Sequence, residues 1–392
     1  MNLRCFKSDI SSNTSGRFIV LKKHTVMMNY NKWLLICAIM LFPLSRAFSQ
    51  SFSESKTYVH QFPVSPKTTV EISNKYGKVQ LLTWNNDSVR VDIDFYIAST
   101  SQARLTKLRN SINFDFSNSS SYVVVKTMFG NSQTKMIDEI KDFAEAIVSG
   151  SNEVRIDYTV HIPANQTIKV TNKYGDIYTD DLTGDVQLNL SNGDLKANDM
   201  KGNLNLFLSF GNAFINDINK GRITAEYADL NIRAAQNISF ETKSSKIRLD
   251  NGNMIKLQSR RDDITIDNAI RITGDGYFSN IRSQNISEEL SLSGKFGKIA
   301  VDNFRKNFSF VNITSEYTDI DLYFERGSGF DFDITYNKDV LLRLPKEVEK
   351  TEEKTLSAET GQMVMYGKVG NSDNSKVKIM APKKCYLNLY LK

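Results

Sequence analysis

An apolar residue recurs at a nearly constant spacing along much of this 392-residue chain. Successive members of the series differ by 17 or 18 in sequence number, and only the last interval is longer, at 21. The nine positions are Ile177, Leu195, Ala213, Leu230, Ile247, Ile264, Ile281, Ile299 and Ile320. A register held over nine units predicts a repeat protein in which each unit packs on the next.

Each unit has the same internal pattern. In residues 185–202, apolar and polar residues alternate from Val186 to Leu190, a Ser-Asn-Gly-Asp turn follows, and a second alternation begins at Leu195. This pattern is typical of strand, turn, strand and turn. Copies stacked ~4.8 Å apart would pair their backbones and join their apolar faces. We therefore predict an all-β-dominated chain with a single-column β-solenoid, similar to a parallel β-helix or roll, of ~17–18 residues per coil.

The turns of the units share small and polar residues. They read Asn-Lys-Tyr-Gly-Asp at 172–176, Ser-Asn-Gly-Asp at 191–194, Ser-Phe-Gly-Asn at 209–212 and Gly-Lys-Phe-Gly-Lys at 294–298. Gly and Asn tolerate a positive φ, and Asp or Asn side chains close a turn on their own backbone. The units around Ser244 and Asp262 lack this Gly. We expect their corners to be wider or differently bent.

Two other solenoids have units of comparable length. A left-handed hexapeptide helix, a fold that hosts acyltransferases, needs an apolar residue every six positions, whereas the apolar residues here follow a period of two. Calcium-binding nonapeptide rolls need Gly-Gly-x-Gly-x-Asp, and no such string occurs. Gly-Asp pairs recur at Gly175, Gly184 and Gly193. The sequence favours turn chemistry for these pairs over a metal site.

Residues 1–49 have the pattern of a secretory signal peptide. Lys32 precedes an apolar run at 33–44, and small residues follow up to Ser49. The run is too short to span a bilayer. We expect cleavage near Ser49 or Gln50 and a true start at Met27 or Met28. No lipid anchor is expected, because Cys37 lies inside the apolar run.

Signal removal changes the charge of the protein. The chain has 50 basic and 44 acidic residues, of which seven basic residues and one acidic residue lie within 1–49. The remainder has 43 of each, so its net charge gives no support for nucleic-acid binding. Of three cysteines only Cys385 remains, which excludes an intrachain disulfide.

The rest of the chain predicts further segments around the repeats. An Asn-Lys-Tyr-Gly string at 74–77 matches the one at 172–175, so a first coil is expected before an insertion. Helical spacing at 102–112 and 134–148 predicts two helices in this insertion, which we interpret as an α/β cap over the open end of the solenoid. The alternative for the helix at 134–148 is a membrane or partner helix. The predicted segments are a signal peptide region at 1–49, a first coil with N-terminal strands at 50–87, an α/β insertion or cap at 88–163, solenoid repeats at 164–336, and C-terminal capping strands with a charged loop (346–354) at 337–392.

Candidate catalytic residues are few. His60 and His161 lie beside predicted strands and are expected to be structural or surface residues. Mixed charge clusters in one corner and the unit before it, at Arg260, Arg261, Asp262, Asp263, Arg248 and Asp250. Carboxylates in such a cluster could form a glycosidase pair, whereas a salt-bridged solvent corner is the interpretation we favour.

An aromatic residue precedes the corner in many units. The positions are Tyr174, Phe210, Tyr227, Phe278, Phe296 and Tyr317. Because equivalent positions of a solenoid stack, these rings could form an exposed ladder that binds sugar or protein. The alternative is that they pack inside or shield the corner.

These features together resemble a known family. The signal ending in Phe-Ser-Gln, the Asn-Lys-Tyr-Gly corners at Asn74 and Asn172, and the later corners are similar to the adhesin-type β-solenoid proteins of unknown function from Bacteroides-like and Flavobacterium-like Gram-negative bacteria. The resemblance covers about residues 70–322, interrupted by the insertion. It implies export and a solenoid fold, and it transfers no catalytic residue.

We therefore expect an exported, non-enzymatic, adhesin-like β-solenoid that binds or scaffolds at the bacterial cell envelope, in the periplasm or at the outer surface. The alternative is a solenoid carbohydrate-active enzyme, a polysaccharide lyase or hydrolase. An envelope glycan or protein is the expected partner, without nucleic acid, and the protein is not expected to be integral to a membrane after signal removal. No catalytic, cofactor-binding or metal-ligating residue and no cofactor is assigned. The sequence does not predict the ligand, the handedness of the coil or the oligomeric state.

Overall fold

The computed structural model describes residues 51–130, 152–371 and 374–392. Residues 1–49 lie outside the described residues, and the described residues belong to one compact unit. The expected signal peptide and the expected helix at 134–148 therefore both fall outside the described part. Within the described ranges, no helix is long and apolar enough to cross a membrane.

The described residues form an all-β fold with one helix, α2 (Gln102–Ser111). Their 21 strands belong to one mixed sheet that does not close on itself. The N-terminal strands are β1 (Phe52–Pro63), β2 (Thr69–Lys75), β3 (Val79–Trp84), β4 (Ser88–Ser99), β5 (Ile112–Asn118), β6 (Tyr122–Phe129) and β7 (Asn152–Pro163). The middle strands are β8 (Thr167–Lys173), β9 (Ile177–Thr179), β10 (Val186–Ser191), β11 (Leu195–Ala197), β12 (Met200–Lys243), β13 (Lys246–Arg260), β14 (Asp263–Phe304) and β15 (Phe310–Phe324). The C-terminal strands are β16 (Phe330–Asn337), β17 (Leu341–Arg343), β18 (Val348–Ser357), β19 (Gln362–Val369), β20 (Lys376–Ala381) and β21 (Tyr386–Leu391).

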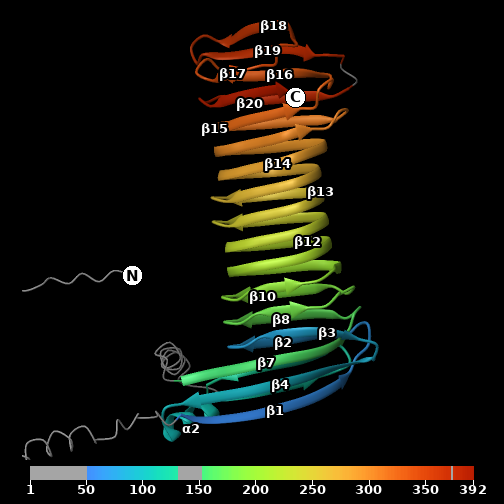
Figure 1. The fold of residues 1–392 in the computed structure, drawn as a ribbon, viewed down its shortest axis with the longest axis vertical. Coiled ribbons are helices and arrows are strands. Elements are labelled where there is room, and N and C mark those ends of the chain that lie inside the picture. The colour runs from blue at the N-terminus through green and yellow to red at the C-terminus, as the bar shows by residue number, and fades with distance from the viewer. Residues whose placement is uncertain (1–50, 131–151, 372–373) are drawn as a thin grey trace, which may run out of the picture. The chain divides into compact units, whose positions relative to one another are not determined.

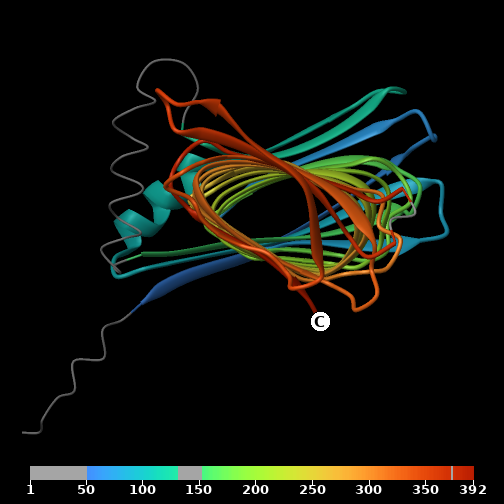
Figure 2. The ribbon, with the colours of Figure 1, turned by 90° about the horizontal axis from the view of Figure 1, so that it is seen from above.

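The middle strands pair in parallel at a nearly fixed separation along the chain. Leu195 pairs with Ile177 on one side and with Ala213 on the other, each at a sequence separation of 18. From β12 through β13 to β14 the separation is 17, and it is 21 where Ile299 pairs with Ile320 in β15. These separations equal the spacings of the recurring apolar residues, so those residues lie side by side in the sheet. The strands consequently lie one above another (Figure 1) and overlie each other when seen from above (Figure 2).

Alternation along each strand separates a buried face from an exposed one. In β10, Val186, Leu188 and Leu190 are buried, and the residues between them are partly exposed. Successive side chains of a strand point to opposite faces of the sheet, so the period of two in the sequence becomes an apolar interior and a polar exterior. One continuous core runs through the described strands.

The two Asn-Lys-Tyr-Gly strings are far apart in the sequence, but they lie on adjacent levels of the stack. Asn74 of β2 pairs with Asn172 of β8 in parallel. Between them, β4 pairs antiparallel with β1 and β7, and β7 pairs in parallel with β3. These strands lie beside β2 and β3 at one end of the stack (Figure 1). The helix expected at 102–112 is found as α2, which is capped by the Ser101 hydroxyl and buries Leu105 and Leu108.

The charged segment at 346–354 is largely a strand rather than a loop, so our expectation of a charged loop is wrong. Residues 348–357 form β18, whose side chains are almost all exposed. Its backbone pairs antiparallel with β19, and no second partner strand is found for it in the described chain. An edge strand can carry charge on both faces, and such charge discourages further strand addition.

One corner of each level from β2 to β15 contains a non-glycine residue with a positive φ. Their φ values lie between 52° and 65°. The residues are Tyr76, Tyr174, Asn192, Phe210, Tyr227, Ser244, Arg261, Phe278, Phe296 and Tyr317. Ser244 and Arg261 share this conformation, so the wider bend that we expected at corners without Gly is not found there. At these two corners the strand is interrupted, since β12 ends at Lys243 and β13 ends at Arg260.

The corner glycines follow the left-handed residue in the chain. Our expectation that these turns place Gly or Asn at positive φ is correct for Asn192 and for Gly297 (φ 118°), and it is wrong for Gly175 and Gly193. A Cβ on Gly193 would lie 2.2 Å from the backbone oxygen of Gly175, and a Cβ on Gly175 would lie 2.0 Å from that of Gly77. Glycine is required here because adjacent levels of the sheet approach too closely for any side chain.

The buried asparagine of each Asn-Lys-Tyr-Gly string ties its corner to a neighbouring strand. Asn74 donates from Nδ2 to the carbonyl oxygen of Ile156 (2.8 Å), and Asn172 donates to that of Gly77 (2.9 Å). These bonds satisfy carbonyl groups that the turn would otherwise leave buried without a partner.

Replacing Gly193 with alanine tests the close approach between adjacent levels. We expect Gly193→Ala to lower the free energy of unfolding by about 2–3 kcal/mol, because its Cβ overlaps a backbone atom that cannot move aside alone. Urea unfolding followed by circular dichroism measures the change. Gly276→Ala is the matched control, since its Cβ would first meet the flexible Cδ1 of Ile281 at 3.1 Å. Equal stability of the two variants would contradict the argument.

Candidate functional site

Asp262, the central residue of the proposed acidic cluster, is buried inside the stack. Only 2% of this residue is exposed. Its carboxylate accepts hydrogen bonds from the hydroxyls of Thr242 and Ser259 (2.7 Å each) and from the backbone N–H groups of Ser245 (2.7 Å) and Arg260 (3.0 Å). These donors engage both carboxylate oxygens, so Asp262 has a structural role and is inaccessible to a substrate.

The other charged residues of the cluster do not form a catalytic pair with Asp262. Asp263 is exposed, because successive residues of an extended segment face opposite sides, and it accepts a hydrogen bond from Asn280 (2.9 Å). Arg248 forms ion pairs with Asp250 (3.3 Å) and Asp267 (2.9 Å). The salt-bridged solvent corner that we favoured is therefore not found as expected, because Asp262 is buried and the ion pairs belong to Arg248 within β13.

Both histidines of the described chain pack against aromatic rings. The His60 ring stacks on Phe116 at 3.8 Å between centroids, and the His161 ring lies 5.3 Å from that of Trp84. No group of three or more potential metal ligands is found among the described residues.

The aromatic corner residues form short stacks on the outside of the protein. Tyr76 stacks on Tyr174 (5.4 Å between centroids), and Phe210 stacks on Tyr227 (5.2 Å). A third stack joins Phe278, Phe296 and Tyr317, at 4.7 and 5.4 Å. Asn192 separates the first two stacks, and Ser244 and Arg261 separate the second from the third. These rings are therefore an exposed ladder with two gaps. Their faces cover one another, which leaves mainly ring edges for a partner.

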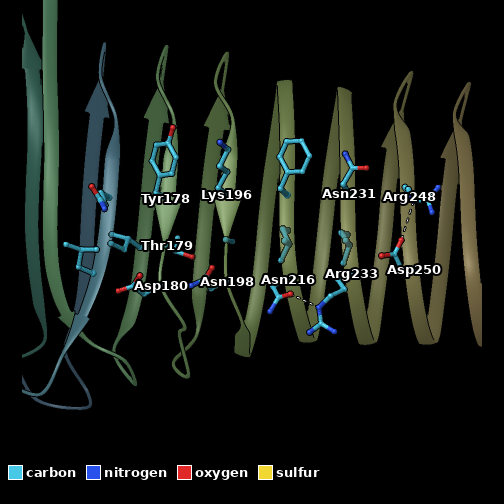
Figure 3. A pocket seen from close by; sticks show the side chains of 17 residues that line it. Tyr178, Thr179, Asp180, Lys196, Asn198, Asn216, Asn231, Arg233, Arg248 and Asp250 are labelled. Carbon is cyan, nitrogen blue, oxygen red and sulfur yellow. Dashed lines mark hydrogen bonds and ion pairs between the residues drawn. The ribbon is translucent and has the colours of Figure 1, made fainter.

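A groove on the outer face of the stack brings together residues from six successive levels. Its volume is about 580 Å³, and it is open to solvent. Figure 3 shows Tyr178, Lys196, Asn231 and Arg248 along one row, and Asp180, Asn198, Asn216, Arg233 and Asp250 along a second. Phe214, which is 48% exposed, also lines the groove.

Strand register places Tyr178, Lys196 and Phe214 on consecutive levels. Tyr178 pairs with Lys196, and Lys196 pairs with Phe214. With ~4.8 Å between paired strands, the two aromatic residues are about 10 Å apart and Lys196 lies between them. The Tyr178 hydroxyl donates to Asp176 (2.9 Å), and this hydrogen bond raises the pKa of Tyr178.

Lys196 differs from the two arginines of the groove in lacking an ion-pair partner. Arg248 is paired with Asp250 and Asp267, and Arg233 is paired with Asp217. Lys196, by contrast, has no ion pair within the described chain, and its ammonium lies 5.9 Å from the centroid of the Tyr178 ring. The groove therefore presents a cation without an ion pair, beside the ring of Tyr178, and the ring of Phe214.

Sequence reasoning did not single out the groove residues, although a signal for them exists. Tyr178, Lys196 and Phe214 each follow directly after a member of the recurring apolar series. Residues at that position alternate to the outer face and stack in one row. Reading this position across units would have shown two aromatic residues flanking a lysine.

No protein-family model matches the chain, and no curated protein matches it. The solved structures that are similar to it include a candidate adhesin from Parabacteroides distasonis, 12% identical, with a TM-score of 0.31, covering 68% of this chain and 97% of that one. A candidate cell adhesion protein from Clostridium sporogenes is 10% identical, with a TM-score of 0.17, covering 86% and 100% of the two chains. A candidate adhesin from Bacteroides fragilis is 9% identical, with a TM-score of 0.21, covering 86% and 97%. At these scores we infer neither fold nor function from the likeness.

The structural role of Asp262 is open to a direct test. We expect Asp262→Ala to lower the free energy of unfolding by about 2 kcal/mol, because it leaves buried hydroxyl and N–H donors without an acceptor. Asp263→Ala, at the adjacent exposed position, should change it by less than about 0.5 kcal/mol. Chemical denaturation measures both. An unchanged stability of the Asp262 variant would show that the buried carboxylate is dispensable.

Proposed function

We propose that this protein is an exported, non-enzymatic, adhesin-like β-solenoid that binds a glycan of the bacterial cell envelope through the groove around Lys196. The observation that carries the proposal is the groove itself. It is elongated, lies on a sheet face and combines the exposed ring of Phe214 and the partly buried ring of Tyr178 with a lysine that has no ion-pair partner in the described chain. Binding sites for sugars need ring faces for stacking and polar groups for hydrogen bonds to hydroxyls.

The solenoid part of the proposal rests on strand register. Parallel pairing at a nearly constant sequence separation is what a single column of coils requires. The proposal of export rests on the apolar run and small residues that precede Gln50.

A binding role fits the residues of the face better than an enzymatic one. A glycosidase needs two carboxyl groups facing one space, one on each side of the scissile bond. Of the acids lining the groove, Asp180 accepts a hydrogen bond from the backbone N–H of Thr83 (3.0 Å), and Asp250 is paired with Arg248. Both are engaged within the protein.

A glycan array of bacterial envelope saccharides tests this function. We expect the full chain to bind a subset of the array and the double variant Tyr178→Ala/Phe214→Ala to bind those glycans at least about tenfold more weakly, a loss of about 1.4 kcal/mol. Phe207→Ala is the matched control, because Phe207 is 46% exposed but lies outside the groove. Absence of any glycan binding would overturn the proposal, and so would equal losses in the variant and the control. Release of cleaved saccharide by the wild type would favour an enzyme instead.

A further inference from the structure

The spacing of the two groove rings points to the length of the unit that the groove accommodates. Tyr178 and Phe214 lie two levels apart, which is about 10 Å along the stack. In an extended β-linked polysaccharide, successive sugars are turned over, so that only every second sugar presents the same face. The length of one such disaccharide unit is comparable to the separation of the two rings. Sugars at alternate positions can therefore stack on Tyr178 and Phe214.

The sugar between these two would lie over Lys196. The ammonium of Lys196 has no ion pair within the described residues, whereas Arg248 and Arg233 are both neutralised, Arg233 by Asp217. A cation without an ion pair in an open groove is complementary to an anion on the ligand. The nearby acids do not supply that anion, because Asp180 bonds to the Thr83 backbone and Asp194 accepts from the backbone N–H and the amide of Asn212 (2.9 Å each).

The amides of the groove complete the site. Asn198 and Asn231 line it, and the side chain of neither has a hydrogen bond within the described chain. An amide both donates and accepts, so these side chains suit the hydroxyl and acetamido groups of sugars. The lining extends over six levels, or about 24 Å, which is long enough for a short oligosaccharide.

We propose that the groove binds an acidic polysaccharide in which a hexuronate alternates with a neutral sugar, the neutral sugars stacking on Tyr178 and Phe214 and the uronate carboxylate pairing with Lys196. This inference rests on the proposed glycan-binding function and specifies its ligand. The chain runs along the stack, across the strands rather than parallel to them.

Isothermal titration with two oligosaccharides of equal length tests this assignment. A hyaluronan hexasaccharide alternates glucuronate with N-acetylglucosamine, and chitohexaose has a β-linked backbone without carboxylates. We expect the full chain to bind the hyaluronan oligosaccharide about tenfold more tightly than chitohexaose, because a hydrogen-bonded charge pair strengthens binding by about that factor. Comparable affinities, or tighter binding of chitohexaose, would overturn the assignment.

The variant Lys196→Gln removes the charge of the side chain but keeps a side chain of similar size, so it tests the contribution of the charge to binding. It should remove the preference for hyaluronan over chitohexaose, whereas Phe214→Ala should weaken the binding of both and keep the preference. Lys169→Gln is the control, since Lys169 is an exposed lysine of β8 that does not line the groove. A preference that survives Lys196→Gln, or that Lys169→Gln also removes, would contradict the pairing.

The outcomes distinguish this inference from the broader function. If the protein binds neutral array glycans through Tyr178 and Phe214 but not the uronate oligosaccharide, the acidic ligand is overturned while glycan binding stands. If it binds neither hexasaccharide and no array glycan, both are overturned. Thermal unfolding of each variant confirms that losses of binding do not arise from unfolding.

Discussion

Parallel backbone pairing between successive levels is the interaction on which the rest of the structure depends. Each short strand buries one face only and satisfies its N–H and C=O groups through the levels on either side. A constant offset also aligns like side chains. Asn251, Asn268, Asn285 and Asn303 consequently form a ladder in which each amide bonds to the one before it, at 3.1–3.2 Å. The same closeness excludes a side chain at the corner glycines and gathers four donors around Asp262.

The register of the strands also aligns the outward-facing side chains of successive levels in rows. Where a row contains opposite charges on neighbouring levels, as at Lys295 and Glu316, they pair with each other and the face is neutralised. Around Lys196 the neighbours in the row are aromatic, so the lysine charge stays available. The location of the groove thus follows from which residue type occupies one position in successive units, and no loop or helix is needed to build it.

The sequence predicted the parts of the fold that depend on periodicity and missed those that depend on distance between levels. Spacing identified the paired residues, and alternation identified the buried face, because both are properties of single strands. The conformation of the corners was inferred from composition, and there the tight approach of Gly175 to Gly77 decided the outcome. Asp262 was assigned to the surface because acids usually lie there, yet its four donors come from residues up to 20 positions away. We interpreted the segment after Lys346 as a loop because its charged residues indicated exposure to solvent. An edge strand exposes its side chains equally, so charge alone did not distinguish a loop from a strand.

The path of the last strands sets an order for the completion of the molecule. β20 lies between β15 and β16, and both β20 and β21 pair with β15. Because β16 to β19 precede β20 in the chain, one side of β15 gains its final partner only when a segment about 50 residues further along has folded onto it. Until then the folding chain has an open β-edge that another copy could occupy. Insertion of the last strands therefore both completes the fold and removes a surface for self-association.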